Sequence, residues 1–597
     1  MHKSLCCTTD FTDNLTCPRG HEHGSGAEAH LFTREDIDAL MAYCADMGAD
    51  RHEWILGNNN SLYDADSPLG YDLMRVACDA AHRYGMRFDV VLKPFDAGGY
   101  GLNRKLPIGL PKPAGVPFIE ERDGIVHGVH PFVAGHPEMR LEREASSAFD
   151  PGGPVRSIRL IAHETAATGI QPGDLSIWTS SDASGASIEP YTGPLSWRET
   201  VEYRPLLRYQ DLSCRVLHLD GLELPASAQF IVIRCERPGD GRLFNHVNHV
   251  AELVQADGRF IPCMPVPGPI TAGDREALHR SALLGYNRYL SHPDVRGVLD
   301  DEDQSAALCQ ATNRLRSTCA APGDPTSIEL KMEPGQQLVL MRGKLRYLGS
   351  ALNPAYPEVR ENWLDQVRFC IQRDVDGVNI RTQGHNWVVD PWAYGFNPPT
   401  MARVQQEGNV AEVARVNGLA YTQFLRDAAL LLHAAGKEMG VHVYTTMIGT
   451  EDRPGVWYHD SLVPRNIEWP WETWIREIAD YVEFRGAFTM RPENLRRAVD
   501  LIGLTAREAG IPFIYQSSRA NGVVTFDGPH NHLGWEIDTV VRPHPDIGVY
   551  NLYETACFTR FDADGRFEGS PRMAALVRRL WAGRADGRKQ SARPDSG

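Results

Sequence analysis

Along this chain an amphipathic stretch, a glycine and a short apolar run follow one another repeatedly. Glycine suits the left-handed position that ends a helix. A short apolar run after it suits a strand that is buried on both faces of a parallel sheet. Glycines stand at this junction at Gly48, Gly85, Gly377, Gly440 and Gly510. Such alternation of helix and strand predicts a parallel α/β fold, and we expect it to close as a (β/α)8 TIM barrel.

Eight apolar runs have the length of buried strands, and a helix is expected before the first of them. Thr33 and Asp36 have the spacing of a capping box at the start of that helix. In a closed barrel the strands end at one rim, where barrel enzymes carry their chemistry. The expected strands, in chain order, are Arg51–Gly57, Phe88–Lys93, one of Gln337–Arg342 and Leu345–Leu352, Val378–Arg381, Val441–Met447, Tyr481–Phe488, Phe513–Gln516 and Val549–Glu554.

The pattern changes between the second and third expected strands. A loop-like stretch rich in Gly and Pro leads into short alternating runs separated by turns, which predict an antiparallel β-sandwich. The expected organisation is therefore a barrel with an insertion. Its parts are a flexible N-terminus (1–30), the first part of the barrel (31–97), an insertion (98–330) with the sandwich at about 155–262 and bridging helices, the remainder of the barrel (331–583) and a disordered tail (584–597).

Composition limits the partners that this protein can have. A chain of 597 residues is too long for one core, and its net charge of −16 disfavours non-specific binding to nucleic acid or to an anionic membrane. The N-terminal segment lacks the apolar core of a signal peptide, and no apolar run is long enough to span a bilayer. We read the 12 scattered cysteines as reduced thiols and expect a cytoplasmic protein.

Four segments resemble the glycosyl-hydrolase-like barrel proteins often called "family 10-like". They are Ala351–Arg360, Asp374–Arg381, Tyr394–Asn397 and Tyr550–Glu554. The resemblance covers Phe32–Lys93 and Gln337–Trp581 and implies a (β/α)8 barrel that acts on a carbohydrate. The chain departs from the largest clan of barrel glycosidases, which places carboxylates after strands four and seven. Here those strands end in Arg381-Thr382 and Gln516-Ser517.

Hydrolysis of a glycosidic bond usually needs two carboxyl groups. Glu554, which ends the eighth expected strand, is the first candidate, because an ionised carboxylate in an apolar and aromatic strand needs a partner or a role. A structural ion pair with a barrel arginine is the alternative. Glu483, within the sixth strand, is the second candidate, although it can equally lie too deep or face the helices. Further carboxylates after strands, of lower rank, are Asp96, Asp390 and Glu451.

Residues near the expected strand ends are candidates for binding substrate. Arg381 has the chemistry to hold a carboxylate or sulfate, or to orient Glu554. Lys93, Arg485 and Arg519 are expected at comparable heights, and such a basic ring indicates an anionic sugar or counter-charge for the acids. Exposed indoles stack on sugar rings, although they also attach loops to a barrel. The substrate-binding set is Lys93, Asp96, Arg381, His385, Asn386, Trp387, Trp392, Tyr444 and Gln516.

Several catalytic motifs are missing from the sequence. It contains no P-loop, no GxGxxG after a strand, no HExxH and no nucleophile elbow, so we expect no cofactor and no metal. The leading interpretation is a glycoside hydrolase on an oligo- or polysaccharide. One alternative is a metal-assisted hydrolase or lyase that uses His385, His442 and an acid. Another is a non-catalytic carbohydrate-binding protein. The insertion is expected to bind sugar, cover the barrel mouth or form a homo-oligomer contact.

Overall fold

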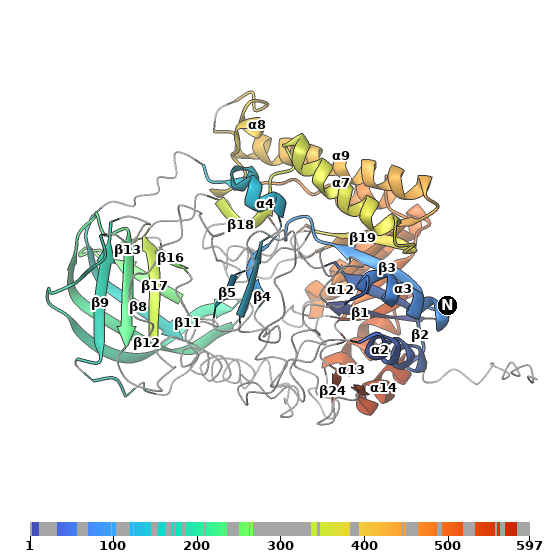
Figure 1. Cartoon of the computed structure of the whole chain (residues 1–597), viewed down its shortest axis with the longest axis horizontal. Coiled ribbons are helices and arrows are strands. Elements are labelled where there is room, and N and C mark those ends of the chain that lie inside the picture. The colour runs from blue at the N-terminus through green and yellow to red at the C-terminus, as the bar shows by residue number, and fades with distance from the viewer. Residues whose placement is uncertain are drawn as a thin grey trace, which may run out of the picture.

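The computed structural model describes most of the barrel and much of the insertion (Figure 1). The residues described are 3–10, 33–56, 70–96, 98–102, 120–122, 125–129, 131–144, 153–162, 167, 169–171, 173–181, 187–207, 210–235, 250–261, 263–266, 336–342, 347–382, 393–406, 408–444, 447–448, 464–485, 492–517, 532–553, 555, 558–561 and 567–581.

Eight strands form a closed barrel in which every neighbouring pair is parallel. This confirms the predicted (β/α)8 TIM barrel. Around the ring the strands follow their order in the chain, so each strand lies beside its predecessor. They are β1 (Ser4–Asp10), β2 (Ala49–Ile55), β3 (Arg87–Leu92), β19 (Gly377–Arg381), β20 (Glu438–Val443), β21 (Tyr481–Arg485), β22 (Phe513–Gln516) and β23 (Ile547–Tyr553).

The first strand of the barrel lies in the segment that was expected to be a flexible N-terminus. That prediction is wrong for β1, which pairs with β2 on one side and β23 on the other. The run Leu5-Cys6-Cys7-Thr8-Thr9 has few large apolar side chains, so its sequence gives only a weak strand signal. All five residues are nevertheless fully buried, because strands enclose β1 on both edges.

The expected third strand is also wrong. β17 (Gln336–Arg342) pairs antiparallel with β13 (Phe230–Cys235) and β16 (Cys263–Val266), and β18 (Tyr347–Leu352) pairs antiparallel with β7 (Arg140–Glu142). Both runs are apolar enough for a barrel strand, but each lies in another sheet. The barrel therefore reaches eight strands through β1, and after β3 it resumes at β19.

Helices surround the barrel strands (Figure 1). Thr33 caps α2 and exchanges hydrogen bonds with Asp36, which confirms the predicted capping box. The helices around the barrel are α2 (Arg34–Asp46), α3 (Leu73–Arg83), α7 (Pro357–Ile371), α9 (Val410–Ala434), α11 (Trp471–Glu477), α12 (Pro492–Ala509), α13 (His532–Glu536) with a π-helical turn (Ile537–Val541), and α14 (Pro571–Val577) with a 3-10 turn (Arg578–Trp581). Short helical segments elsewhere are α4 (Pro131–Gly135), a 3-10 turn (Pro137–Met139) and α8 (Pro398–Met401).

Not every glycine that marked a helix–strand junction ends a helix. Gly48, Gly85 and Gly510 have the positive φ angles, 95°, 73° and 73°, of a left-handed cap. Gly377 and Gly440 instead lie within β19 and β20. A Cβ on Gly440 would come within 2.3 Å of the Tyr481 ring, and one on Gly377 within 2.5 Å of Asp89 Oδ1. Close packing inside the barrel is the reason for glycine at these two positions.

Two five-stranded antiparallel sheets lie beside the barrel (Figure 1). One has the order β10-β9-β13-β17-β16 and the other β11-β12-β8-β14-β15. Ile177 and Ile231 of the first sheet belong to the same buried cluster as Ile158 and Leu219 of the second. The strands are β8 (Val155–Ala162), β9 (Leu175–Ser180), β10 (Glu189–Pro190), β11 (Ser196–Leu207), β12 (Gln210–Leu224), β13 (Phe230–Cys235), β14 (Val250–Val254), β15 (Phe260–Ile261) and β16 (Cys263–Val266).

With β17 the antiparallel region extends to Arg342, beyond the expected limits of 262 for the sandwich and 330 for the insertion. Smaller antiparallel sheets contain β4 (Gly98–Leu102), β5 (Glu120–Arg122) and β6 (Ile125–Val129), and β24 (Thr559–Phe561) and β25 (Phe567–Gly569). In the ranges described above, no helix is long and apolar enough to cross a membrane.

Candidate functional site

Four polar side chains from alternate strands meet in one layer inside the barrel. Asn551 Nδ2 lies 2.8 Å from Glu53 Oε2 and 2.7 Å from Glu483 Oε1. Asn379 Nδ2 donates to Glu53 Oε1 at 3.1 Å and also to Glu483 Oε2. These residues belong to β2, β19, β21 and β23, no two of which are neighbours, so the contacts cross the barrel interior. TIM barrels are filled by such layers, but branched apolar residues usually form them.

The two carboxyl groups of this layer bind the same two amides and act on one another electrostatically. Burial raises the pKa of Glu483 well above its usual value, and the neighbouring Glu53 raises it further, whereas the hydrogen bond from Asn551 lowers it. Thr8 Oγ1 completes the layer, 3.2 Å from Glu53 Oε2 and 2.9 Å from Asn551 Oδ1. All four residues of the layer, and Thr8, are fully buried.

Glu483 was predicted from the sequence as a catalytic carboxyl group, and the structure places it in this closed layer. Glu53, its partner, was not predicted. The available signal was a glutamate within the short run His52-Glu53-Trp54, where its neighbours are bulky and buried. A charge in such a strand points to a buried partner, but nothing in the local sequence identifies that partner.

Two arginines lie one step closer to the carboxyl ends of the strands. The guanidinium carbons of Arg381 and Arg485 lie 4.9 Å and 4.2 Å from the centre of the Tyr553 ring. Arg381 Nε donates to Tyr444 Oη at 2.6 Å. Burial opposes the charge of Arg381, but Tyr444, Tyr553 and Glu483 outweigh burial and raise its pKa. Arg381 thus joins the carboxylate layer to the aromatic groups above it.

His442 lies beside these arginines on β20. Its backbone pairs with Arg381 on one side and Glu483 on the other, and its ring stacks on Tyr444 with 4.5 Å between ring centres. The side chain is buried, and neither ring nitrogen has a hydrogen-bond partner in the described part of the chain. Burial, followed by Arg381 and Arg485, lowers the pKa of His442 well below its usual value. The imidazole is therefore neutral at physiological pH, with one donor and one acceptor.

Four predicted substrate-binding residues lie at or just after strand ends on this side of the barrel. Lys93 Nζ lies 3.5 Å from Asp96 Oδ2, and both side chains are buried just after β3. Burial raises the pKa of Tyr444, while Arg381, Arg485 and Lys93 act in the opposite direction, which places all three cations around this phenol. Gln516, the last residue of β22, is buried, and its Oε1 has no hydrogen-bond partner among the described residues.

The structure thus brings together Arg381 and Tyr444, and separately Lys93 and Asp96. Another tryptophan, Trp474 on α11, is buried and donates to Thr422 Oγ1 at 3.0 Å. It belongs to the packing between helices. The candidates that lie outside the described residues are Glu554, His385, Asn386, Trp387, Trp392, Asp390 and Glu451.

The alternative of metal-assisted chemistry depended on His385, His442 and an acid. His385 lies outside the described residues. His442 stacks on Tyr444, is acted on by the charges of Arg381 and Arg485, and pairs through its backbone with Glu483. Within the described ranges no cluster of three or more His, Cys, Asp or Glu side chains has the arrangement to hold a metal ion.

No protein-family model and no curated protein matches this chain. Similar solved structures include the catalytic domain of β-amylase from Paenibacillus polymyxa, 7% identical with a TM-score of 0.32 over 97% of each chain. Another is trehalose-6-phosphate hydrolase from Bacillus licheniformis, 7% identical with a TM-score of 0.33 over 92% of this chain and 64% of that one. A GH18 chitinase from Pseudoalteromonas aurantia is 12% identical with a TM-score of 0.21, over 48% and 83% of the two chains.

These three solved structures are glycoside hydrolases. Likeness at such TM-scores carries no argument about activity. What the fold and the interior define is a TIM-barrel protein whose barrel contains carboxyl, amide, guanidinium and phenol groups. Its function is argued from those groups.

Proposed function

We propose that this protein is a glycoside hydrolase that acts at the carboxyl ends of its barrel strands. The observation that carries the proposal is the group of Arg381, Arg485, Tyr444 and Tyr553 inside that end of the barrel. Active sites of TIM-barrel enzymes lie at this face. A barrel interior that served packing alone would hold branched apolar residues, because buried charges carry a large desolvation penalty.

The chemistry of these groups suits a carbohydrate. Guanidinium, ammonium and amide groups donate to sugar hydroxyls, and phenol rings offer flat faces to the C–H faces of a sugar ring. Arg381, Tyr444, Lys93 and Gln516 supply these groups near the strand ends, and the Asp96 carboxylate accepts from sugar hydroxyls. We propose them as substrate-binding residues. From the sequence alone, the same role is proposed for His385, Asn386, Trp387 and Trp392.

The acid and base chemistry needs two carboxyl groups. We propose Glu554, which follows the last residue of β23 in the chain, together with Asp96, which is buried beside Lys93 after β3. Glu483 was the earlier second candidate, but amide groups from Asn379 and Asn551 occupy both of its oxygens. We therefore propose it as a positioning residue that acts through Arg381, whose charge it stabilises.

The test is an assay of turnover on a panel of α- and β-linked glucans, chitin oligosaccharides and uronic-acid polysaccharides. Cleavage is measured as the release of new reducing ends. We expect wild-type protein to cleave at least one member, and Glu554→Gln and Asp96→Asn to lower kcat at least 100-fold while sugar binding is retained. Glu472→Gln, on the exposed face of α11, is the matched control and should leave turnover unchanged. Absence of cleavage across the panel would contradict the proposal.

A carbohydrate-binding protein without catalysis is the second candidate. The observation in its favour is that β19 and β22 end in Arg381 and Gln516, where many barrel glycosidases carry carboxylates. Under this alternative the wild-type protein binds a glycan from the panel without cleaving it, and Glu554→Gln leaves the binding unchanged. Mass spectrometry of the bound glycan after long incubation separates the two candidates.

A further inference from the structure

We infer that the barrel contains a subsite for an anionic group of the ligand, a carboxylate or a sulfate, formed by His442 with Arg381 and Arg485. The inference rests on the proposed function only in taking the ligand to be a carbohydrate, and it narrows that ligand to acidic sugars. Three neighbouring strands supply the groups, β19 for Arg381, β20 for His442 and β21 for Arg485.

The first argument is the state of the His442 ring. The side chain is 1% exposed, and within the described part of the chain neither Nδ1 nor Nε2 has a hydrogen-bond partner. A buried polar group without a partner costs about 1–3 kcal/mol, and native interiors contain few of them. Its only recorded ring contact among the described residues is stacking on Tyr444. A bound ligand that accepts from the imidazole N–H would remove this penalty.

The second argument is the arrangement of the cations around His442. The backbone of Arg381 pairs directly with that of His442, and Arg381 and Arg485 both act on the imidazole electrostatically. Both guanidinium groups contact one ring, that of Tyr553, so both lie beside the same side chain. A planar guanidinium donates two parallel hydrogen bonds to a carboxylate or a sulfate. Such a pair next to a neutral N–H donor is suited to an oxyanion.

A role as counter-charge for Glu53 and Glu483, the carboxyl groups one layer deeper in the barrel, explains only part of this arrangement. It accounts for Arg381, because Glu483 raises the pKa of that guanidinium. It does not account for His442, which stays neutral and has no recorded hydrogen bond to Glu53 or Glu483. A phenylalanine would stack on Tyr444 as well and would bury no unpaired nitrogen. The imidazole therefore indicates a polar ligand at this level of the barrel.

The experiment is isothermal titration of the full-length protein at pH 7 and low salt with glucuronic acid, glucose 6-sulfate and glucose. We expect one or both acidic sugars to bind at least tenfold more tightly than glucose, and the tighter of the two identifies the anion. In His442→Phe and in Arg485→Gln this preference should fall to about threefold or less, with the folded state checked by thermal unfolding. Equal affinity for all three sugars in the wild-type protein would overturn the inference.

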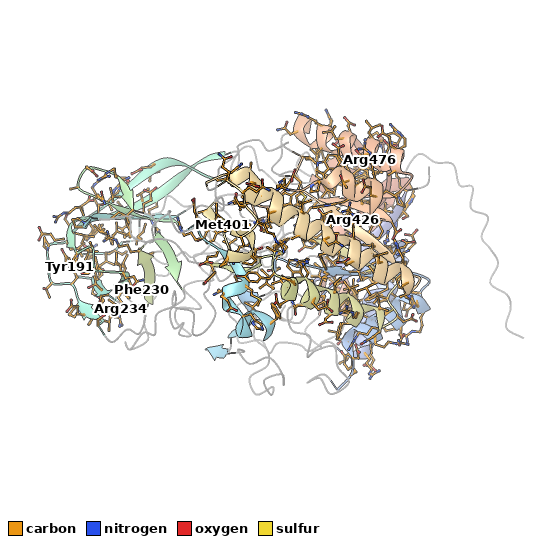
Figure 2. All side chains as sticks on the ribbon, turned by 90° about the horizontal axis from the view of Figure 1, so that it is seen from above. Tyr191, Phe230, Arg234, Met401, Arg426 and Arg476 are labelled. Carbon is orange, nitrogen blue, oxygen red and sulfur yellow. The ribbon has the colours of Figure 1, made fainter. Side chains whose placement is uncertain are left out.

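Arg476→Gln is the matched control. Arg476 lies on α11 in the outer helical layer, where it pairs with Glu472 and Glu508 (Figure 2). Arg476→Gln removes one positive charge, as Arg485→Gln does, but it removes that charge in the outer helical layer and not inside the barrel. The preference for acidic sugars should be unchanged in this variant. A loss equal to that of Arg485→Gln would show that net charge alone causes the preference, and would also overturn the inference.

Imidazole nitrogen shifts give a second readout that does not depend on turnover. In 15N-histidine-labelled protein, the signal that is missing from His442→Phe should move on addition of the preferred acidic sugar and stay in place with glucose. No movement with either acidic sugar would contradict a ligand at His442. Binding of an acidic sugar without cleavage of any glycan would refute the hydrolase and leave the subsite intact. Cleavage of neutral glycans without any preference for acids would refute only the subsite.

Discussion

Glu53 on β2 and Glu483 on β21 stand on opposite sides of the barrel, and their carboxyl groups bind the same two amides, those of Asn379 and Asn551. The strands that carry the amides, β19 and β23, are also opposite one another. Four alternate strands are thus joined by hydrogen bonds across the interior. This layer separates the arginines at the carboxyl ends of the strands from the Arg51–Asp89 ion pair at the other end.

Glu483→Gln should change how stability depends on pH. Because the folded-state pKa of Glu483 lies above the unfolded value near 4.5, the wild-type protein is stabilised by this group below that pH and loses the contribution as the pH rises. A glutamine does not titrate. The variant's melting temperature, compared with that of the wild type, should therefore increase from pH 5 to pH 8 in a series of calorimetric scans.

The control for this series is Glu472→Gln, because Glu472 is exposed on α11. Its melting temperature should follow that of the wild type within the error of the measurement at every pH. A difference for Glu483→Gln that stays constant or shrinks as the pH rises would show that folding does not raise the pKa of Glu483.

Asn551→Ala should strongly destabilise the barrel. The amide of Asn551 donates to both Glu53 and Glu483, and without it two buried carboxyl groups lose a shared donor. We expect a loss of about 2–4 kcal/mol in the free energy of unfolding, measured by urea titration with a fluorescence readout. Gln423→Ala, an exposed amide on α9 that bonds Asp427, should cost less than about 0.5 kcal/mol. Similar losses for the two variants would contradict the role given to the layer.

Leu5→Ala tests the place of the N-terminal strand. Leu5 is fully buried in β1 between β2 and β23, so the substitution should lower the free energy of unfolding by about 2–5 kcal/mol. Removal of residues 1–10 should prevent the barrel from closing and give insoluble protein. Leu430→Ala, at a leucine that is 68% exposed on α9, should have little effect. A soluble truncated protein with native circular dichroism would show that the ring closes without β1.

His442→Phe should preserve or increase stability even though it removes a residue of the proposed subsite. The ring still stacks on Tyr444, and two buried nitrogens without recorded partners are removed. We expect a melting temperature no lower than that of the wild type, and up to about 2 °C higher, in the absence of ligand. A drop of several degrees would show that the imidazole makes a stabilising interaction in the free protein.

The sequence predicted seven of the eight barrel strands to within a few residues, β2, β3 and β19 to β23, because each is a short apolar run close to a helix or a glycine. It missed β1, whose cysteines and threonines carry little apolar surface. It also expected one of the runs that form β17 and β18 to be a barrel strand, although both pair in antiparallel sheets. An apolar run shows that a segment is buried, but not which strand lies beside it. Pairing depends on residues distant in the sequence.

For the candidate site, the sequence identified Arg381, Tyr444, Lys93 and Asp96 as polar residues at or just beyond strand ends, and the structure places two of them, Arg381 and Tyr444, in contact. It did not identify Glu53, Asn379 or Asn551 as partners of Glu483, because nearly 500 residues separate Glu53 from Asn551.

By itself, the sequence determined that the chain forms a barrel, because the periods of its apolar residues follow from local helix and strand geometry. Only the tertiary structure decided which eight strands close the ring, which side chains share a layer and that His442 lies between two arginines. These relationships depend on strand register and on the closure of the ring, and a shift of one residue would turn each inward side chain outward.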